Sequence, residues 1–131
     1  MRKKIYMLII VVLFFTSFTW AQESSLTITD RKTNPTIVNP GGKVLISCKV
    51  SHSEDPVFIG RVAATVYYDK WTTAYSMLYD DGTHGDIESD DGHFSLEIIA
   101  GKNPGMAQVI FHALDNNGHE IDSNPISFTI Q

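Results

Sequence analysis

Hydrophobic and polar residues alternate along most of this chain, most clearly between Lys43 and Val50. In that segment Val44, Ile46, Cys48 and Val50 fall on one side of the alternation. Successive side chains of a β-strand point to opposite faces, so this period of two predicts a strand with one buried face. The same alternation predicts strands at 93–98, 107–114 and 126–130, and residues rich in β-branched and aromatic types predict two more at 62–68 and 74–79.

Turn-forming residues separate these segments. Pro40-Gly41-Gly42 precedes the strand at 43–50, and Asn116-Asn117-Gly118 follows the strand at 107–114. Gly and Asn supply the backbone conformations that tight turns need. No segment beyond residue 25 keeps the 3.6-residue period of a helix. About seven short strands of this kind predict an all-β fold with one antiparallel β-sandwich, which we expect to occupy residues 22–131.

The first 21 residues have the pattern of a secretory signal peptide. Arg2, Lys3 and Lys4 precede an apolar stretch, and Thr19-Trp20-Ala21 offers small residues at the positions required for cleavage. The apolar stretch is shorter than the roughly 20 residues of a membrane-spanning helix. We therefore expect cleavage after Ala21 and an exported protein, whether secreted, periplasmic or at the cell surface; a retained N-terminal anchor is the alternative.

Charge narrows the set of partners. Removal of the signal leaves seven Lys and Arg against 15 Asp and Glu, a net charge of −8 with His neutral. Nucleic-acid binding requires clustered basic residues, so we expect no nucleic-acid partner. We expect instead a monomer that does not span the membrane after cleavage and that binds a protein or glycan of the cell envelope.

Cys48 is the only cysteine, so no intramolecular disulfide can form. Its position on the apolar side of the strand at 43–50 predicts a buried, reduced thiol. A reactive or dimer-forming thiol is the alternative.

An Asp- and Gly-rich segment between Asp80 and Gly92 interrupts the strand pattern. Its aspartates are Asp80, Asp81, Asp86, Asp90 and Asp91. They supply enough oxygen ligands for Ca²⁺, although the spacing is not that of an EF-hand. The alternative is that these carboxylates close turns by accepting hydrogen bonds from backbone N–H groups. Either interpretation predicts an ordered loop.

Aromatic residues gather in the two strands predicted at 62–68 and 74–79. Trp71, Tyr67 and Tyr75 are our candidates for a binding surface, because exposed aromatic rings stack on sugars and anchor protein partners. The alternative is that these rings are half-buried strand residues, which strands favour in any case.

The order of these motifs resembles a known family. Asp80-Asp81-Gly82-Thr83-His84-Gly85-Asp86, followed by Asp91-Gly92-His93-Phe94, is similar to the immunoglobulin/fibronectin-III-like accessory module of exported bacterial proteins, as in spore-coat-kinase-like and surface-anchored proteins. Asp80, Asp86 and Asp91 match the family pattern, so the resemblance makes them the candidate Ca²⁺ ligands. One departure is Phe94, which stands where the family usually has a Tyr.

The resemblance implies a structural, adhesive or protein-binding role. A carbohydrate-binding module and a Ca²⁺-stabilised accessory domain are the alternatives. No nucleophile elbow, phosphate-binding Gly-rich loop or Cys–His pair is found in the sequence. We therefore expect no enzymatic activity, no catalytic residues and no cofactor other than Ca²⁺.

Overall fold

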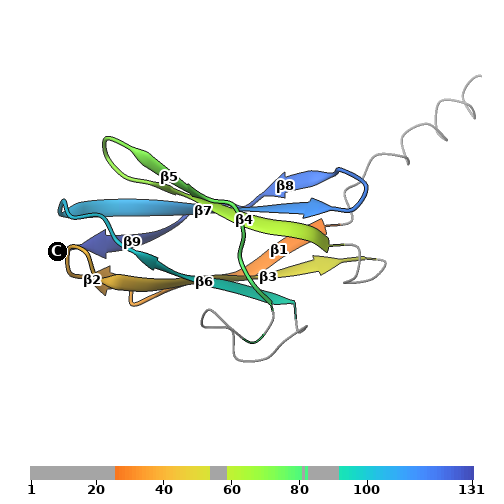
Figure 1. Cartoon of the computed structure of the whole chain (residues 1–131), viewed down its shortest axis with the longest axis horizontal. Helices are drawn as coiled ribbons and strands as arrows, with labels where there is room; N and C mark the ends of the chain where they lie inside the picture. The colour runs from red at the N-terminus through yellow and green to blue at the C-terminus, as the bar shows by residue number, and fades with distance from the viewer. Residues whose placement is uncertain (1–25, 54–58, 81, 83–91) are drawn as a thin grey trace, which may run out of the picture.

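The computed structural model describes residues 26–53, 59–80, 82 and 92–131. These residues form two facing β-sheets, with no helix among them (Figure 1). The strands are β1 (Leu26–Asn34), β2 (Ile37–Val38), β3 (Lys43–His52), β4 (Ile59–Tyr67), β5 (Thr72–Tyr75), β6 (His93–Ile99), β7 (Gly105–Asp115), β8 (Glu120–Asp122) and β9 (Ile126–Ile130). The predicted all-β fold is confirmed. No helix in the described part of the chain is long and apolar enough to cross a membrane.

The smaller sheet has three strands in the order β1-β3-β6, with both pairs antiparallel. Its centre is β3, the strand with the clearest alternation. Val44, Ile46 and Cys48 are each fully buried and lie opposite Ile98, Leu96 and Phe94 of β6. Opposed residues share a face of the sheet, so the apolar sides of the two strands point together into the core.

The larger sheet has six strands. Its order is β2-β9-β7-β4-β5, and β8 pairs with the second half of β7 on the side where β9 pairs with the first half. Ala107, Val109, Phe111 and Ala113 of β7 are fully buried, as the alternation predicts. Full burial of a Val or Phe side chain, as at Val109 and Phe111, stabilises a fold by about 1.5–3 kcal/mol.

Two of the segments that pass from one sheet to the other make backbone hydrogen bonds with neighbouring strands. After β1 the chain passes Pro35 and reaches β2, where Thr129 N–H donates to Thr36 O (2.8 Å) and Gln131 N–H donates to Val38 O (3.0 Å). After β5, Leu78 N–H donates to Val62 O of the larger sheet, and Tyr79 exchanges two backbone hydrogen bonds with Ser95 of the smaller sheet. The connection after β1 is therefore hydrogen-bonded to β9 of the larger sheet, and the segment after β5 is hydrogen-bonded to both sheets.

Two sequence predictions need correction. The strand pairing is not wholly antiparallel as predicted, because β2 and β9 run parallel. The strand predicted at 74–79 is instead β5 at Thr72–Tyr75. Tyr68 N–H donates to Trp71 O, which closes a turn early and brings Thr72 opposite Tyr67. The apolar residues at 77–79 belong to the crossing segment, in which Leu78 is buried.

Candidate functional site

An open groove lies between two turns at the end of the molecule that carries the C-terminus. They are the β4–β5 turn, residues 68–71, and the β6–β7 connection, residues 100–104 (Figure 1). The groove consists of two adjoining depressions of about 370 and 520 Å³ that share Tyr68, Asp69 and residues 104–106 as lining. We call this surface the end groove.

Tyr68 and Trp71 form the aromatic wall of the first depression. Their rings stack with centroids 4.7 Å apart and an angle of 21° between the planes. Gly101 lies against both rings: a Cβ at Gly101 would lie 2.8 Å from Trp71 Cζ2 and 3.2 Å from Tyr68 Cε1. Only a residue without a side chain fits there. The indole thus packs between Tyr68 and the Gly101 backbone, while 38% of the residue stays exposed.

Burial raises the pKa of the Tyr68 hydroxyl, and a hydrogen bond with the Gly101 backbone acts in the opposite direction. Burial also raises the pKa of Tyr75, and the nearby Tyr68 raises it further. Both hydroxyls consequently stay protonated at physiological pH, where they can donate hydrogen bonds.

The second depression opens on the outer face of the larger sheet. Tyr67 lies directly opposite Gln108, and Met106 stands two residues before Gln108 on β7. Tyr67 is 40% exposed and Met106 is 63% exposed. Asp69 and Lys70 in the turn and Asn103 opposite them supply hydrogen-bonding groups. An exposed aromatic and apolar floor with polar edges suits a ligand that presents a flat apolar face and hydroxyl or amide groups.

The structure brings together two of the three aromatic candidates. Trp71 lines the first depression and Tyr67 the second. Tyr75 lies opposite Ala64, which is buried, so its ring points to the core side of the sheet, where it packs against the core. The neighbours Tyr68 and Met106 complete the surface. Tyr68 belongs to the aromatic residues that the sequence groups together, whereas no pattern in the sequence distinguishes Met106.

Of the Ca²⁺ candidates, the structure describes Asp80, whereas Asp86 and Asp91 lie outside the described residues. Asp80 Oδ2 accepts a hydrogen bond from Gly92 N–H at 2.9 Å. Gly92 has a φ of 82°, which favours glycine, and its carbonyl accepts from Val50 N–H. Asp80 therefore closes the base of the loop against β3, as the turn interpretation expects. The Ca²⁺ site stays a prediction.

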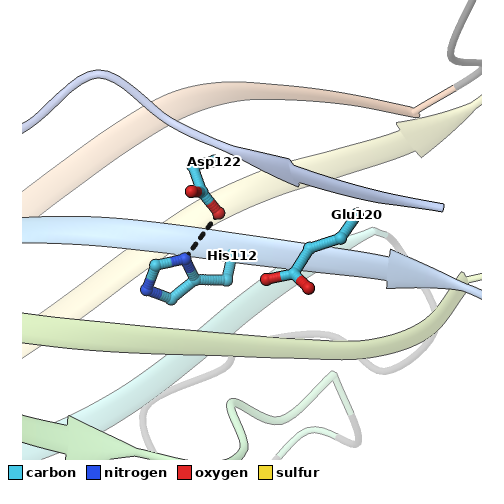
Figure 2. Close-up of side chains that lie close together, drawn as sticks. All are labelled: His112, Glu120 and Asp122. Carbon is cyan, nitrogen blue, oxygen red and sulfur yellow. Dashed lines mark hydrogen bonds and ion pairs between the residues drawn. The ribbon is translucent and has the colours of Figure 1, made fainter. Parts of the chain in front are cut away.

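A second polar cluster lies on the β7–β8 hairpin. His112, Glu120 and Asp122 stand on one face of it, and their ligand atoms all lie within 4.8 Å of one another (Figure 2). His112 Nδ1 is 2.6 Å from Asp122 Oδ1, and His112 Nε2 is 2.9 Å from Thr65 Oγ1 of β4. We call these three residues the hairpin cluster. Sequence reasoning missed it because the grouping depends on which residues of the hairpin stand opposite one another.

Beneath the same hairpin is a buried carboxylate. Asp115 Oδ1 accepts from the N–H groups of Asn117 and His119, at 2.9 and 2.8 Å. Its Oδ2 lies 3.0 Å from His119 Nδ1 and 3.6 Å from His52 Nε2. Burial alone would raise the pKa of Asp115, but the hydrogen bonds from His119 and Asn117 outweigh it and lower the pKa. The network shapes the hairpin turn, so we assign it a structural role.

Comparison with known proteins adds a likeness of fold. No protein-family model matches the chain, and no curated protein matches it. Among solved structures, it is similar to the Pseudomonas fluorescens alkylpurine DNA glycosylase AlkC bound to DNA containing an abasic site analog, with a TM-score of 0.50 and 14% identity. The match covers 82% of this chain but 31% of the glycosylase chain. At that identity the likeness concerns the fold alone.

Proposed function

We propose that this chain is an exported, non-catalytic module of the immunoglobulin/fibronectin-III-like class, and that it binds a protein of the cell envelope through the end groove. The strand order supports the class. Counting β2 with β1 and β8 with β9 leaves seven strands, three in one sheet and four in the other. Sandwiches of this class have about seven strands in two facing sheets.

The observation that carries the binding proposal is the exposed apolar surface of the end groove. Trp71, Tyr67 and Met106 keep between 38% and 63% of their surface accessible. Trp71 lines the first depression, Tyr67 lines the second, and Met106 lines both. Trp and Tyr are enriched among residues that dominate binding energy, and Met adapts to different partners. The groove is open and shallow, which suits a partner surface better than a small substrate.

Met106 and Met77 provide a matched pair of variants to test this. Both are exposed methionines, at 63% and 49%, but only Met106 lines the end groove. Immobilised protein should capture a partner from the native envelope, and Met106→Ala and Trp71→Ala should each weaken binding of the purified partner by tenfold or more, equivalent to about 1.4 kcal/mol. Met77→Ala should leave binding unchanged.

Trp71 also supplies a direct optical readout. The chain has two tryptophans, Trp20 and Trp71, so removal of the signal leaves Trp71 alone. Its fluorescence should change when the purified partner is added. Equal affinity of wild-type protein and the Met106→Ala and Trp71→Ala variants would exclude the end groove as the binding surface.

Glycan binding is the second candidate, and the stacked Tyr68–Trp71 pair favours it. Sugar rings stack on aromatic rings that are partly exposed, as Trp71 is. Purified envelope oligosaccharides should then change Trp71 fluorescence when no protein partner is present. That response should persist in Met106→Ala if the sugar stacks on the indole alone, whereas a protein partner should depend on both residues.

Export is supported by the N-terminal pattern of positive charge, apolar stretch and small residues. The intact mass of the exported species should correspond to a chain that begins at Gln22. A mass that includes residues 1–21 would favour the retained anchor instead.

A DNA-binding role is not part of the proposal, although the similar glycosylase is bound to DNA. The exported form has a net charge of −8. Its Lys and Arg residues also lie on several separate elements, namely Arg31, Lys32, Lys43, Lys49, Arg61, Lys70 and Lys102. Binding to the phosphate backbone requires these charges on one surface.

A further inference from the structure

We propose that the hairpin cluster, His112, Glu120 and Asp122, is a binding site for a divalent transition-metal ion of the Zn²⁺ type. The cluster offers one imidazole and two carboxylates. Imidazole nitrogen and carboxylate oxygen together are a common ligand set for Zn²⁺, whereas Ca²⁺ and Mg²⁺ prefer oxygen alone. The site is separate from the end groove, because none of its three residues lines either depression.

The register of the hairpin positions all three ligands. His112 lies opposite Asp122, and Leu114 lies opposite Glu120. Residues two apart on a strand share a face, so Glu120 and Asp122 of β8 stand on the same face as His112 of β7. Figure 2 shows the three side chains on this one face of the hairpin. The arrangement therefore follows from strand pairing that the fold fixes.

Thr65 orients the imidazole. β7 lies between β8 and β4, so the ring of His112 reaches a partner on each side: Nδ1 meets Asp122 of β8, and Nε2 meets Thr65 Oγ1 of β4. Metal-binding histidines regularly use their second ring nitrogen in a hydrogen bond that fixes the ring. In the tautomer that carries its hydrogen on Nε2, this nitrogen donates to Thr65 Oγ1 and leaves the lone pair of Nδ1 available to a metal ion.

The distances fit a site that closes on the ion. Three ligand atoms within 4.8 Å of one another must approach slightly to reach bond lengths of about 2.0–2.2 Å. Glu120 and Asp122 are exposed, so their side chains can make this adjustment, while His112 is half-buried and held by Thr65. Three protein ligands leave at least one coordination position for water or a donor group of a partner.

The test is calorimetric titration of the tag-free exported form with Zn²⁺. We expect one saturable site per chain that excess Ca²⁺ or Mg²⁺ does not block. His112→Ala should abolish this site, and Asp122→Asn should weaken it. Thr65→Val should weaken Zn²⁺ binding by about 10–100-fold while the stoichiometry stays at one, because it removes only the bond that orients the ring.

Glu97→Gln is the matched control for loss of an exposed carboxylate. Glu97 lies on β6 of the other sheet, 3.6 Å from Lys43, and should not affect Zn²⁺ binding. Circular dichroism should establish that each variant is folded, and Co²⁺ absorption in the visible range should report the coordination of nitrogen and oxygen ligands. The proposal is overturned if wild-type protein shows no saturable site, or if folded His112→Ala binds Zn²⁺ as tightly as wild type.

Discussion

His52 Nε2 lies 3.6 Å from Asp115 Oδ2, and the two side chains are 3% and 2% exposed. His52 ends β3 of the smaller sheet and Asp115 ends β7 of the larger one, so this buried pair connects the two sheets. Asp115 also accepts the hydrogen bonds that form the β7–β8 turn. One carboxylate thus maintains both the turn and the contact between the sheets.

The lowered pKa of Asp115 makes folding stability depend on pH. The ordinary value for this carboxyl is 3.8, and the folded state lowers it. The unfolded chain then binds the proton more tightly, so the stabilisation is complete above about pH 4 and is lost as pH falls through the folded-state pKa. Urea denaturation between pH 2 and pH 6 should show this loss, and Asp115→Asn should reduce it. An unchanged pH dependence in Asp115→Asn would contradict the assignment.

Gly101→Ala should disturb the end groove, since the added Cβ would lie 2.8 Å from Trp71 Cζ2. Overpacking of this kind costs about 1–3 kcal/mol of the free energy of unfolding. Denaturant melts should measure that cost, and Trp71 fluorescence should show the displaced indole. The cost should be smaller in a Trp71→Ala background, because the clashing ring is gone. An equal cost in both backgrounds would place the strain elsewhere.

Cys48→Ser should destabilise the fold by about 1–3 kcal/mol, because it buries a hydroxyl at a position with 0% exposure. Cys48→Ala is the companion variant, which removes the thiol without adding a polar group. Burial raises the pKa of the native thiol to about 12. A thiol reagent should therefore label Cys48 slowly in the native protein and rapidly in the denatured protein. Fast labelling of the native protein would contradict the burial of the Cys48 side chain.

Asp80→Ala should cost about 1–2 kcal/mol, since it removes the acceptor of the hydrogen bond from Gly92 N–H. If the Asp-rich segment also binds Ca²⁺, the wild-type melting temperature should rise with Ca²⁺ and not with Mg²⁺ at the same ionic strength. Asp80→Ala should abolish that difference. If Ca²⁺ and Mg²⁺ change the melting temperature equally, Asp80 acts only by accepting the hydrogen bond from Gly92 N–H.

The sequence predicted those features that depend on local alternation. β3, β7 and β9 lie where period two places them, and Cys48 is buried as predicted. The position of β5 could not be read in this way, because the apolar pattern at 74–79 is shared by a strand and by a segment that crosses the core. There the hydrogen bond from Tyr68 to Trp71 decides where the chain reverses.

Candidate sites were predictable only in part, for the same reason. Trp71 and Tyr67 stood out by residue type, but the opposite faces of Tyr67 and Tyr75 follow from the pairing of β4 with β5. His112 and Asp122 are ten residues apart and meet only because β7 and β8 pair in one register. A shift of one residue would place them on different faces. Such sites require the fold before they can be recognised.

The parallel pairing of β2 with β9 determines how this molecule would respond to tension. Pulling β2 from its N-terminal end and β9 from its C-terminal end slides the two strands past each other. The hydrogen bonds at Thr36 and Val38 are then loaded together, rather than opened one after another. Because simultaneous rupture takes more force than sequential rupture, this edge of the larger sheet should resist stretching in that direction.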